Sequence, residues 1–155
     1  AYGLQEYISF KQIVPSSSNV IRNQTEQNRI TNNMEDVWIM NFPVSKQKSL
    51  VLKEQQSMKN LTIGINALNG VSMLELNGLE ALEKVVIMRG GLSGGTGRLR
   101  ITNCTSLNRI TIGEEAFIRY KYLELVDLPR LRTINIGSNG FMNIKSIQMD
   151  SNSKD

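Results

Sequence analysis

One stretch of this chain is nearly repeated 24 residues later: LNRITIGEEAF at residues 107–117 returns as LRTINIGSNGF at residues 131–141. Three earlier stretches fit the same pattern: MEDVWIMNFPV (34–44), MKNLTIGINAL (58–68) and LEKVVIMRGGL (82–92). Their starts at 34, 58, 82, 107 and 131 lie 24, 24, 25 and 24 residues apart. The extra residue falls near SGGTG (93–97), a glycine-rich loop that absorbs an insertion without disturbing a strand.

A second apolar pair recurs at the same phase of every repeat. The pairs are Leu50 and Leu52, Leu74 and Leu76, Leu99 and Ile101, Leu123 and Leu125, and Ile147 and Met149. Each repeat therefore has six apolar slots, and all of them are filled in a chain that is only 40% hydrophobic. Random filling would give this result with a probability on the order of 10⁻¹². The chain is a repeat array.

The spacing of the apolar slots indicates strands. An L-x-L or I-x-I pair places two side chains on the same side of an extended strand, because side chains alternate with period two. Two such pairs per repeat predict a mainly β, right-handed solenoid of about five 24-residue coils, with two short parallel strands per coil and little or no long helix. Equivalent first-strand residues should then be buried in one column: Leu61, Val85, Ile110 and Ile134.

The first half of each repeat resembles the leucine-rich repeat signature L-x-x-L-x-L-x-x-N-x-L. Met58, Leu61, Ile63, Asn66 and Leu68 match every slot, as do Leu131, Ile134, Ile136 and Asn139, followed by Phe141 in the final apolar slot. The Asn slot holds Phe42, Gly90 and Glu115 in the other repeats, so a side-chain hydrogen-bond ladder there would be broken. The fragment IGEEAF also resembles the I-G-x-x-A-F element of BspA-like repeats of bacterial and protist surface proteins, without their usual Cys after AF.

The resemblance covers residues 34–155 and divides the chain into two parts. Residues 34–155 should form the solenoid, with coils 34–57, 58–81, 82–106, 107–130 and 131–155. Residues 1–33 should form an N-terminal cap or arm that is partly disordered. Within that arm, the polar residues 15–33 are expected to be a loop or linker, with Ile30 starting a truncated second-half strand.

The two ends of the array would expose its core. Residues 1–14 contain Tyr2, Leu4, Tyr7, Phe10 and Ile13, which are apolar enough to cover the first coil. Solenoids need such a cap, and a disordered or crossing arm is the alternative. The sequence ends one residue after the fifth full repeat without a capping sequence. This predicts either a piece of a longer repeat protein or an end that a partner covers.

Composition argues against several classes of site. The chain has no histidine, which is the commonest general base and metal ligand. We therefore expect no catalytic residue, metal site or cofactor. Cys104, the single cysteine, shares a column with Leu79 and Leu128 and should be a buried, inert thiol. A lone cysteine favours a reducing compartment, but secretion without disulfides stays open, so the location is either cytoplasmic or the cell surface and beyond. No signal peptide or membrane span is expected on this chain.

The formal charge is +4, with acidic and basic residues well mixed. Eight cations lie between residues 89 and 132: Arg89, Arg98, Arg100, Arg109, Arg119, Lys121, Arg130 and Arg132. They occupy different phases of the repeat, so they should surround the coil and not form a stripe. A nucleic-acid partner is therefore not expected, because its footprint needs cations gathered on one face.

The outward positions of the first strands are the candidate binding residues: Trp38, Met40, Thr62, Val86, Met88, Thr111 and Asn135. Exposed Trp is a common interface anchor, and the sheet in front of a leucine-rich repeat solenoid is usually its binding surface, as the resemblance implies. The alternative is that the N-terminal arm covers Trp38. On the second strands, Glu75, Arg100 and Glu124 should form a charge ladder that fixes the register.

These patterns favour a non-catalytic interaction module that presents a rigid parallel sheet to a protein, or to a glycan. A structural role, in which modules stack end to end through the open last coil, is the alternative. An enzyme on a parallel β-helix would need clustered carboxylates or a basic residue in a groove. No first-strand column carries aligned Asp or Glu.

Overall fold

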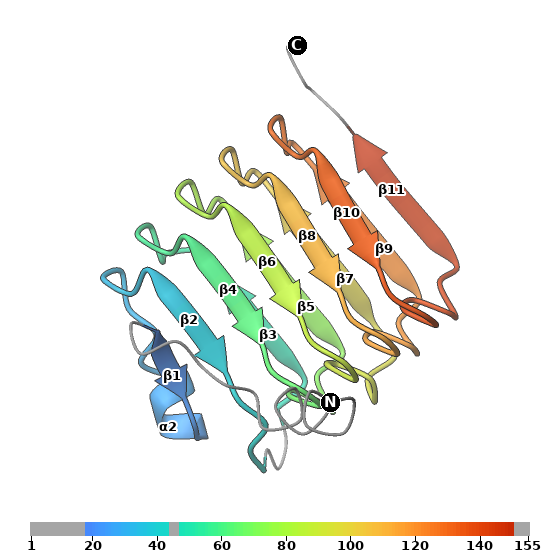
Figure 1. The fold of residues 1–155 in the computed structure, drawn as a ribbon, viewed down its shortest axis with the longest axis horizontal. Helices are drawn as coiled ribbons and strands as arrows, with labels where there is room; N and C mark the ends of the chain where they lie inside the picture. The colour runs from blue at the N-terminus through green and yellow to red at the C-terminus, as the bar shows by residue number, and fades with distance from the viewer. Residues whose placement is uncertain (1–17, 44–46, 151–155) are drawn as a thin grey trace, which may run out of the picture.

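A computed structural model describes residues 18–43 and 47–150 of the 155-residue chain. It is a mainly β solenoid of about five coils, as predicted. Each coil contributes one strand to each of two sheets (Figure 1). The first strands are β2 (Asp36–Ile39), β4 (Asn60–Ile63), β6 (Lys84–Ile87), β8 (Arg109–Ile112) and β10 (Thr133–Ile136). The second strands are β3 (Ser49–Leu52), β5 (Met73–Asn77), β7 (Arg98–Thr102), β9 (Tyr122–Val126) and β11 (Ser146–Asp150).

Every strand pairing is parallel and keeps equivalent repeat positions in register. The first sheet has the order β1-β2-β4-β6-β8-β10, and the second has the order β3-β5-β7-β9-β11. In Figure 1 the chain descends through the first sheet in front and rises through the second sheet behind as it advances from left to right, which makes the coil right-handed.

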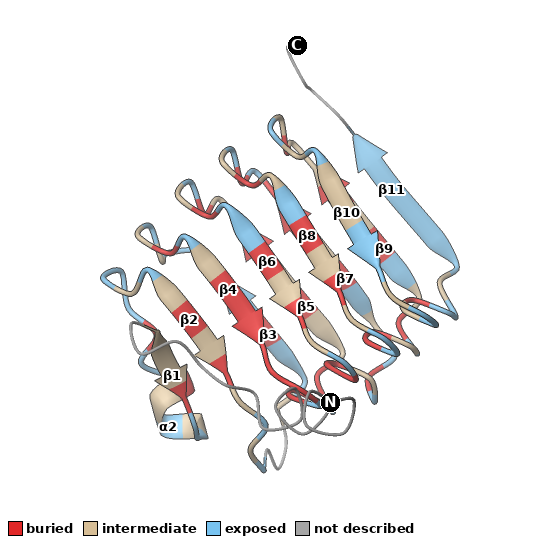
Figure 2. Ribbon diagram, viewed as in Figure 1, coloured by how far each residue is buried: buried red, intermediate tan, exposed pale blue. Residues whose placement is uncertain are grey.

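The core lies between the two sheets and consists of stacked aliphatic columns. Leu61, Val85 and Ile110 are buried in one column, as predicted, and are joined by register pairs on successive strands. Ile134 continues that column but is only partly buried, which corrects the prediction for this residue. Its coil has a neighbour on one side only within the described residues. Figure 2 shows the same change from buried central strands to an exposed β11.

Four turns after the first strands share a left-handed backbone at the Asn slot. The φ angles of Asn66, Gly90, Glu115 and Asn139 are 57°, 71°, 60° and 63°. Gly and Asn adopt this region most readily, which explains why the slot favours them. Glu115 is the residue least suited to it.

The left-handed residues also bond forward along the solenoid. The backbone N–H of Asn66 donates to Arg89 O at 3.0 Å, and that of Gly90 donates to Glu114 O at 2.9 Å. Strand N–H groups bond backward, as Gly64 does to Ile39 O at 2.7 Å. A backbone ladder therefore joins the coils where the side-chain ladder was expected to be broken.

The described part of the N-terminal segment, residues 18–33, is not the loop that we expected. Strand β1 (Asn19–Ile21) pairs with β2, and a single helical turn, α2 (Gln24–Gln27), follows it. The Asn23 side chain accepts a hydrogen bond from Glu26 N at 2.9 Å and caps that turn. Ile30 is buried but belongs to no strand, because the helical turn replaces the second strand of this shortened coil. The predicted cap at residues 1–14 lies outside the described residues.

Candidate interaction surface on the first sheet

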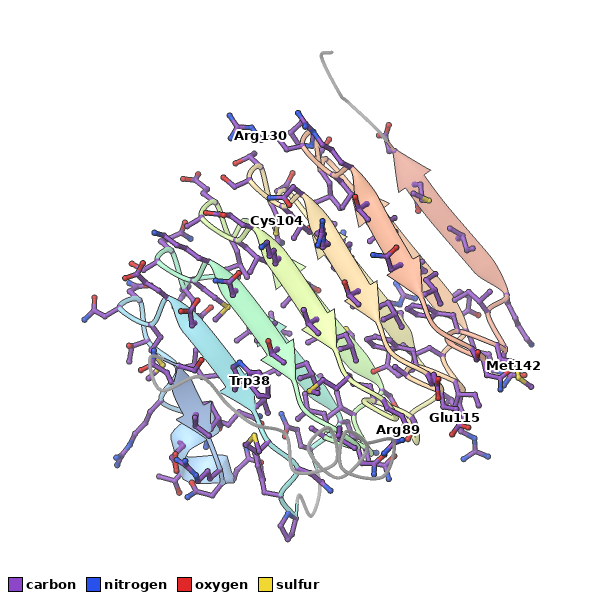
Figure 3. All side chains as sticks on the ribbon, viewed as in Figure 1. Trp38, Arg89, Cys104, Glu115, Arg130 and Met142 are labelled. Carbon is purple, nitrogen blue, oxygen red and sulfur yellow. The ribbon has the colours of Figure 1, made fainter. Side chains whose placement is uncertain are left out.

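All seven predicted binding residues lie on the outward face of the first sheet. Register pairs align Trp38, Thr62, Val86, Thr111 and Asn135 in one column. Met40 and Met88 continue their strands into the neighbouring column, where their N–H groups donate to Ile21 O and Ile63 O. Figure 3 shows Trp38 on the front face of β2.

The side chains in this group differ in exposure. Trp38, Met40, Val86, Met88 and Thr111 are half-buried, and Asn135 is exposed. Thr62 is 8% exposed, because it lies between the larger Trp38 and Val86. The outward position of Thr62 was predicted correctly, but this residue has little surface left for a partner.

A hollow of about 290 Å³ opens on this face across three coils. Its lining residues are Ser18, Asp36, Trp38, Asn60, Leu61, Thr62, Lys84 and Val86. The Trp38 ring, Leu61 and Val86 supply apolar surface, and the other side chains add polar groups around it. The hollow therefore combines a fixed aromatic side chain with charged groups.

A third outward column precedes the Trp38 column, and the sequence analysis did not treat it as part of the surface. It consists of Asp36, Asn60, Lys84, Arg109 and Thr133. The Asn60 amide donates to the Asp36 carboxylate, and the Asn19 amide donates to Asp36 O at 3.4 Å. These residues share one repeat position, and that position was the signal that could have found them.

Lys84 and Arg109 are direct neighbours on β6 and β8, and both are exposed. Within the part of the chain that the structure describes, the ion pairs involve Lys59, Arg98 and Arg100 but neither of these two cations. Like charges opposite each other on adjacent strands are destabilising. The first sheet therefore carries an uncompensated pair of positive charges beside the hollow.

The second sheet treats its charges differently, as the sequence predicted. Arg100 lies between Glu75 and Glu124, with its Nη1 3.8 Å from Glu75 Oε1 and its Nε 3.1 Å from Glu124 Oε2. The second contact is an ion pair without a well-aligned Nε–H bond. Arg98 Nη1 also lies 3.1 Å from Glu124 Oε1. The outward charges on this sheet are satisfied within the sheet.

The eight cations between residues 89 and 132 are dispersed, as expected. Arg98 and Arg100 lie on the second sheet, and Arg109 lies on the first. Figure 3 shows Arg89 and Arg130 at opposite edges of the first sheet. Arg130 and Arg132 line a separate hollow of about 510 Å³ with Glu83, Ser106 and Asn108.

Cys104 is fully buried, as predicted. Burial raises the pKa of its thiol to about 11. The described residues contain no group of three or more Cys, Asp or Glu side chains that could hold a metal ion. Over the same ranges, no helix has the length and apolar character needed to cross a membrane.

Comparison of this chain with protein-family models, curated proteins and solved structures gave no match.

Proposed function

We propose that this protein is a non-catalytic interaction module of the leucine-rich repeat type, whose first sheet binds a protein or a glycan. The observation that carries the proposal is the half-exposed Trp38 beside a hollow that spans three coils. Parallel ladders hold this face rigid, so a partner would meet preorganised side chains with little loss of conformational entropy.

The left-handed turns support the leucine-rich repeat assignment. A signature Asn is expected where the backbone needs φ near +60°, and Asn66 and Asn139 occupy that position, with Gly90 in a third coil. The 24-residue period and the two strands per coil agree with the same family.

The outward chemistry of the first sheet supports binding over catalysis. Asp36 is the only carboxylate in the three outward columns that the structure describes, and the Asn60 amide already bonds to it. General acid–base chemistry on a sheet of this kind commonly needs two carboxylates or a poised base.

The test is a Trp38→Ala variant, with Tyr122→Ala as its matched control. Tyr122 is an exposed aromatic on the second sheet, 41% accessible, so its removal alters the opposite face. Ligands selected from a glycan array and from a displayed peptide library should bind Trp38→Ala at least about thirtyfold more weakly, as for a hot-spot anchor worth about 2 kcal/mol. Tyr122→Ala should bind like the wild type. Equal binding by all three proteins would refute the proposed surface.

The fluorescence of Trp38, the only tryptophan, gives a second readout. Iodide should quench it in the free protein, and a bound ligand should protect it. Complete protection before any ligand is added would favour a cover formed by the N-terminal arm.

Stacking end to end is the second candidate function, and the last coil favours it. Ile136, Ile147 and Met149 are 49%, 56% and 57% exposed. A hollow of about 230 Å³ opens beside them between the sheets, lined by Leu125, Leu128, Leu131, Arg132, Ile134, Met149 and Asp150. Apolar surface of this kind marks contact sites. Sedimentation should then show concentration-dependent association that the Ile147→Lys variant abolishes. A monomer at all concentrations would exclude self-stacking.

A further inference from the structure

We propose that the partner of the first sheet is an acidic segment of a protein. An apolar side chain of that segment enters the Trp38 hollow, and a nearby carboxylate lies between Lys84 and Arg109. This inference rests on the proposed function and narrows its partner to one chemical class.

The cation pair supplies the first argument. Lys84 and Arg109 occupy adjacent strands, where Cβ atoms of paired residues lie about 5 Å apart. Their column neighbours Asn60 and Thr133 are neutral. A carboxylate placed between the two cations would turn a repulsive pair into an alternating one, which is the arrangement of Glu75, Arg100 and Glu124 on the second sheet.

The nearest acidic side chains in this chain have other contacts. The carboxylate of Asp36 accepts the hydrogen bond from Asn60, at the far end of the column. Glu83 lies at the rim beside Arg130 and Arg132, and its negative charge helps to raise the pKa of Lys59. The missing carboxylate must therefore come from a partner.

The hollow supplies the second argument, because it ties the charge to an apolar group. Lys84 lines the same hollow as Trp38 and Val86. The strands that carry Trp38 and Lys84 are two apart, about 10 Å at the usual strand spacing. An extended segment covers that distance in about three residues. An apolar residue and an acidic residue within three positions of each other would reach both features.

The apolar lining favours a protein over a sulfated or carboxylated glycan. An anionic glycan would neutralise Lys84 and Arg109 but would bring no aliphatic side chain to the surface of Trp38, Leu61 and Val86. Burial of that surface is favourable only against another apolar group. The net charge of +4 favours acidic partners in general.

The experiment selects random twelve-residue displayed peptides on the full chain and measures the affinity of enriched peptides by fluorescence anisotropy. The test variant is Lys84→Glu/Arg109→Glu. The matched control is Lys48→Glu/Lys53→Glu, which makes the same charge change at two exposed residues flanking β3 of the second sheet. Enriched peptides should carry an apolar residue within three positions of Asp or Glu. The test variant should bind them at least about tenfold more weakly, and the control should change affinity less than about twofold.

A charge exchange sharpens the result. A peptide in which Lys replaces the acidic residue should bind the Lys84→Glu/Arg109→Glu variant more tightly than it binds the wild type. Peptides without an acidic residue, peptides that ignore the charge reversal, or a selection that enriches nothing would each overturn the inference.

Two further readouts separate this inference from the proposed function. If selected peptides lose affinity in Trp38→Ala but not in the charge-reversed variant, the surface stands and the acidic partner is wrong. If a heparin fragment binds the wild type, fails to bind the charge-reversed variant and no peptide is enriched, the partner is a sulfated glycan and the inference fails. If peptides ignore both changes, the proposed function fails as well.

Discussion

The central coils and the last coil carry the same pattern of residues, but their environments differ. Ile112 and Ile136 are register partners in the same slot, yet Ile112 is 2% exposed and Ile136 is 49% exposed. The difference arises from stacking and not from residue type, because each coil buries its slots against two neighbours or against one. A repeat therefore supplies its own controls: the same substitution in two coils separates the effect of the residue from the effect of its position.

The largest difference is expected for a charge placed in the first core slot. Ile110→Asp would bury an unpaired carboxylate among aliphatic side chains and should lower the free energy of unfolding by at least about 4 kcal/mol. Ile134→Asp puts the same charge in the partly exposed last coil and should cost much less. Thermal melts followed by circular dichroism compare the two variants. An unchanged melt for Ile110→Asp, or equal losses, would remove the distinction.

Cavity formation should show the same contrast on a smaller scale. Ile112→Ala should cost about 3 kcal/mol, because the surrounding columns prevent the cavity from collapsing. Ile136→Ala should cost less than about 1 kcal/mol, because half of that side chain is already in contact with water. Urea denaturation gives both values. A large loss for Ile136→Ala would mean that another group covers the last coil in solution.

The central interior can also be tested by alkaline titration of Cys104. Its thiol pKa is raised to about 11 from 9.0, so folding favours the protonated form. The stability that this thiol contributes is complete below pH 9 and is lost as the pH rises to about 11, by about 3 kcal/mol. Urea midpoints across this range should fall less steeply in Cys104→Ala. Burial also raises the pKa of Tyr120, so both proteins should lose stability above pH 10. Parallel curves would show that water reaches Cys104.

The smallest effect concerns the left-handed turns. Glu115 has φ 60° without being Gly or Asn, so Glu115→Asn should raise the free energy of unfolding by about 0.5 kcal/mol. The reverse exchange should cost a similar amount at Asn66 and less at Asn139, where only one neighbouring coil holds the turn. Melting temperatures measure all three variants. A loss for Glu115→Asn would indicate that the Glu115 side chain makes a contact that outweighs its backbone strain.

Much of the fold follows from periodicity. The register of Glu75, Arg100 and Glu124, and the shared face of Trp38 and Val86, could be predicted because strands alternate with period two and coils repeat every 24 or 25 residues. The first thirty-odd residues lack that period, so β1 and α2 were missed: a three-residue strand and a four-residue helix leave almost no pattern in a sequence. Their positions depend on packing against β2, which is a tertiary effect.

The candidate surface was predicted in part for a related reason. The sequence analysis placed Trp38 and the methionines on one face from their spacing, but it read Arg109 only as one of eight dispersed cations. That Arg109 has Lys84 beside it and no acidic neighbour on either side appears only when residues 25 apart are set on adjacent strands. Whether Trp38 lies near Tyr7 or Phe10 falls outside the described residues.

The orientation of the backbone hydrogen bonds between coils has a mechanical consequence. Those bonds run along the solenoid axis, from Asn66 to Arg89 and from Gly64 back to Ile39. Tension applied between the two ends therefore pulls the coils apart one after another and does not shear all of them together. The outermost coil, held on one side, should detach first, and each detachment should release about 80 Å of extended chain. Such a molecule lengthens in equal steps at low force and behaves as a series of weak links, each the length of one repeat.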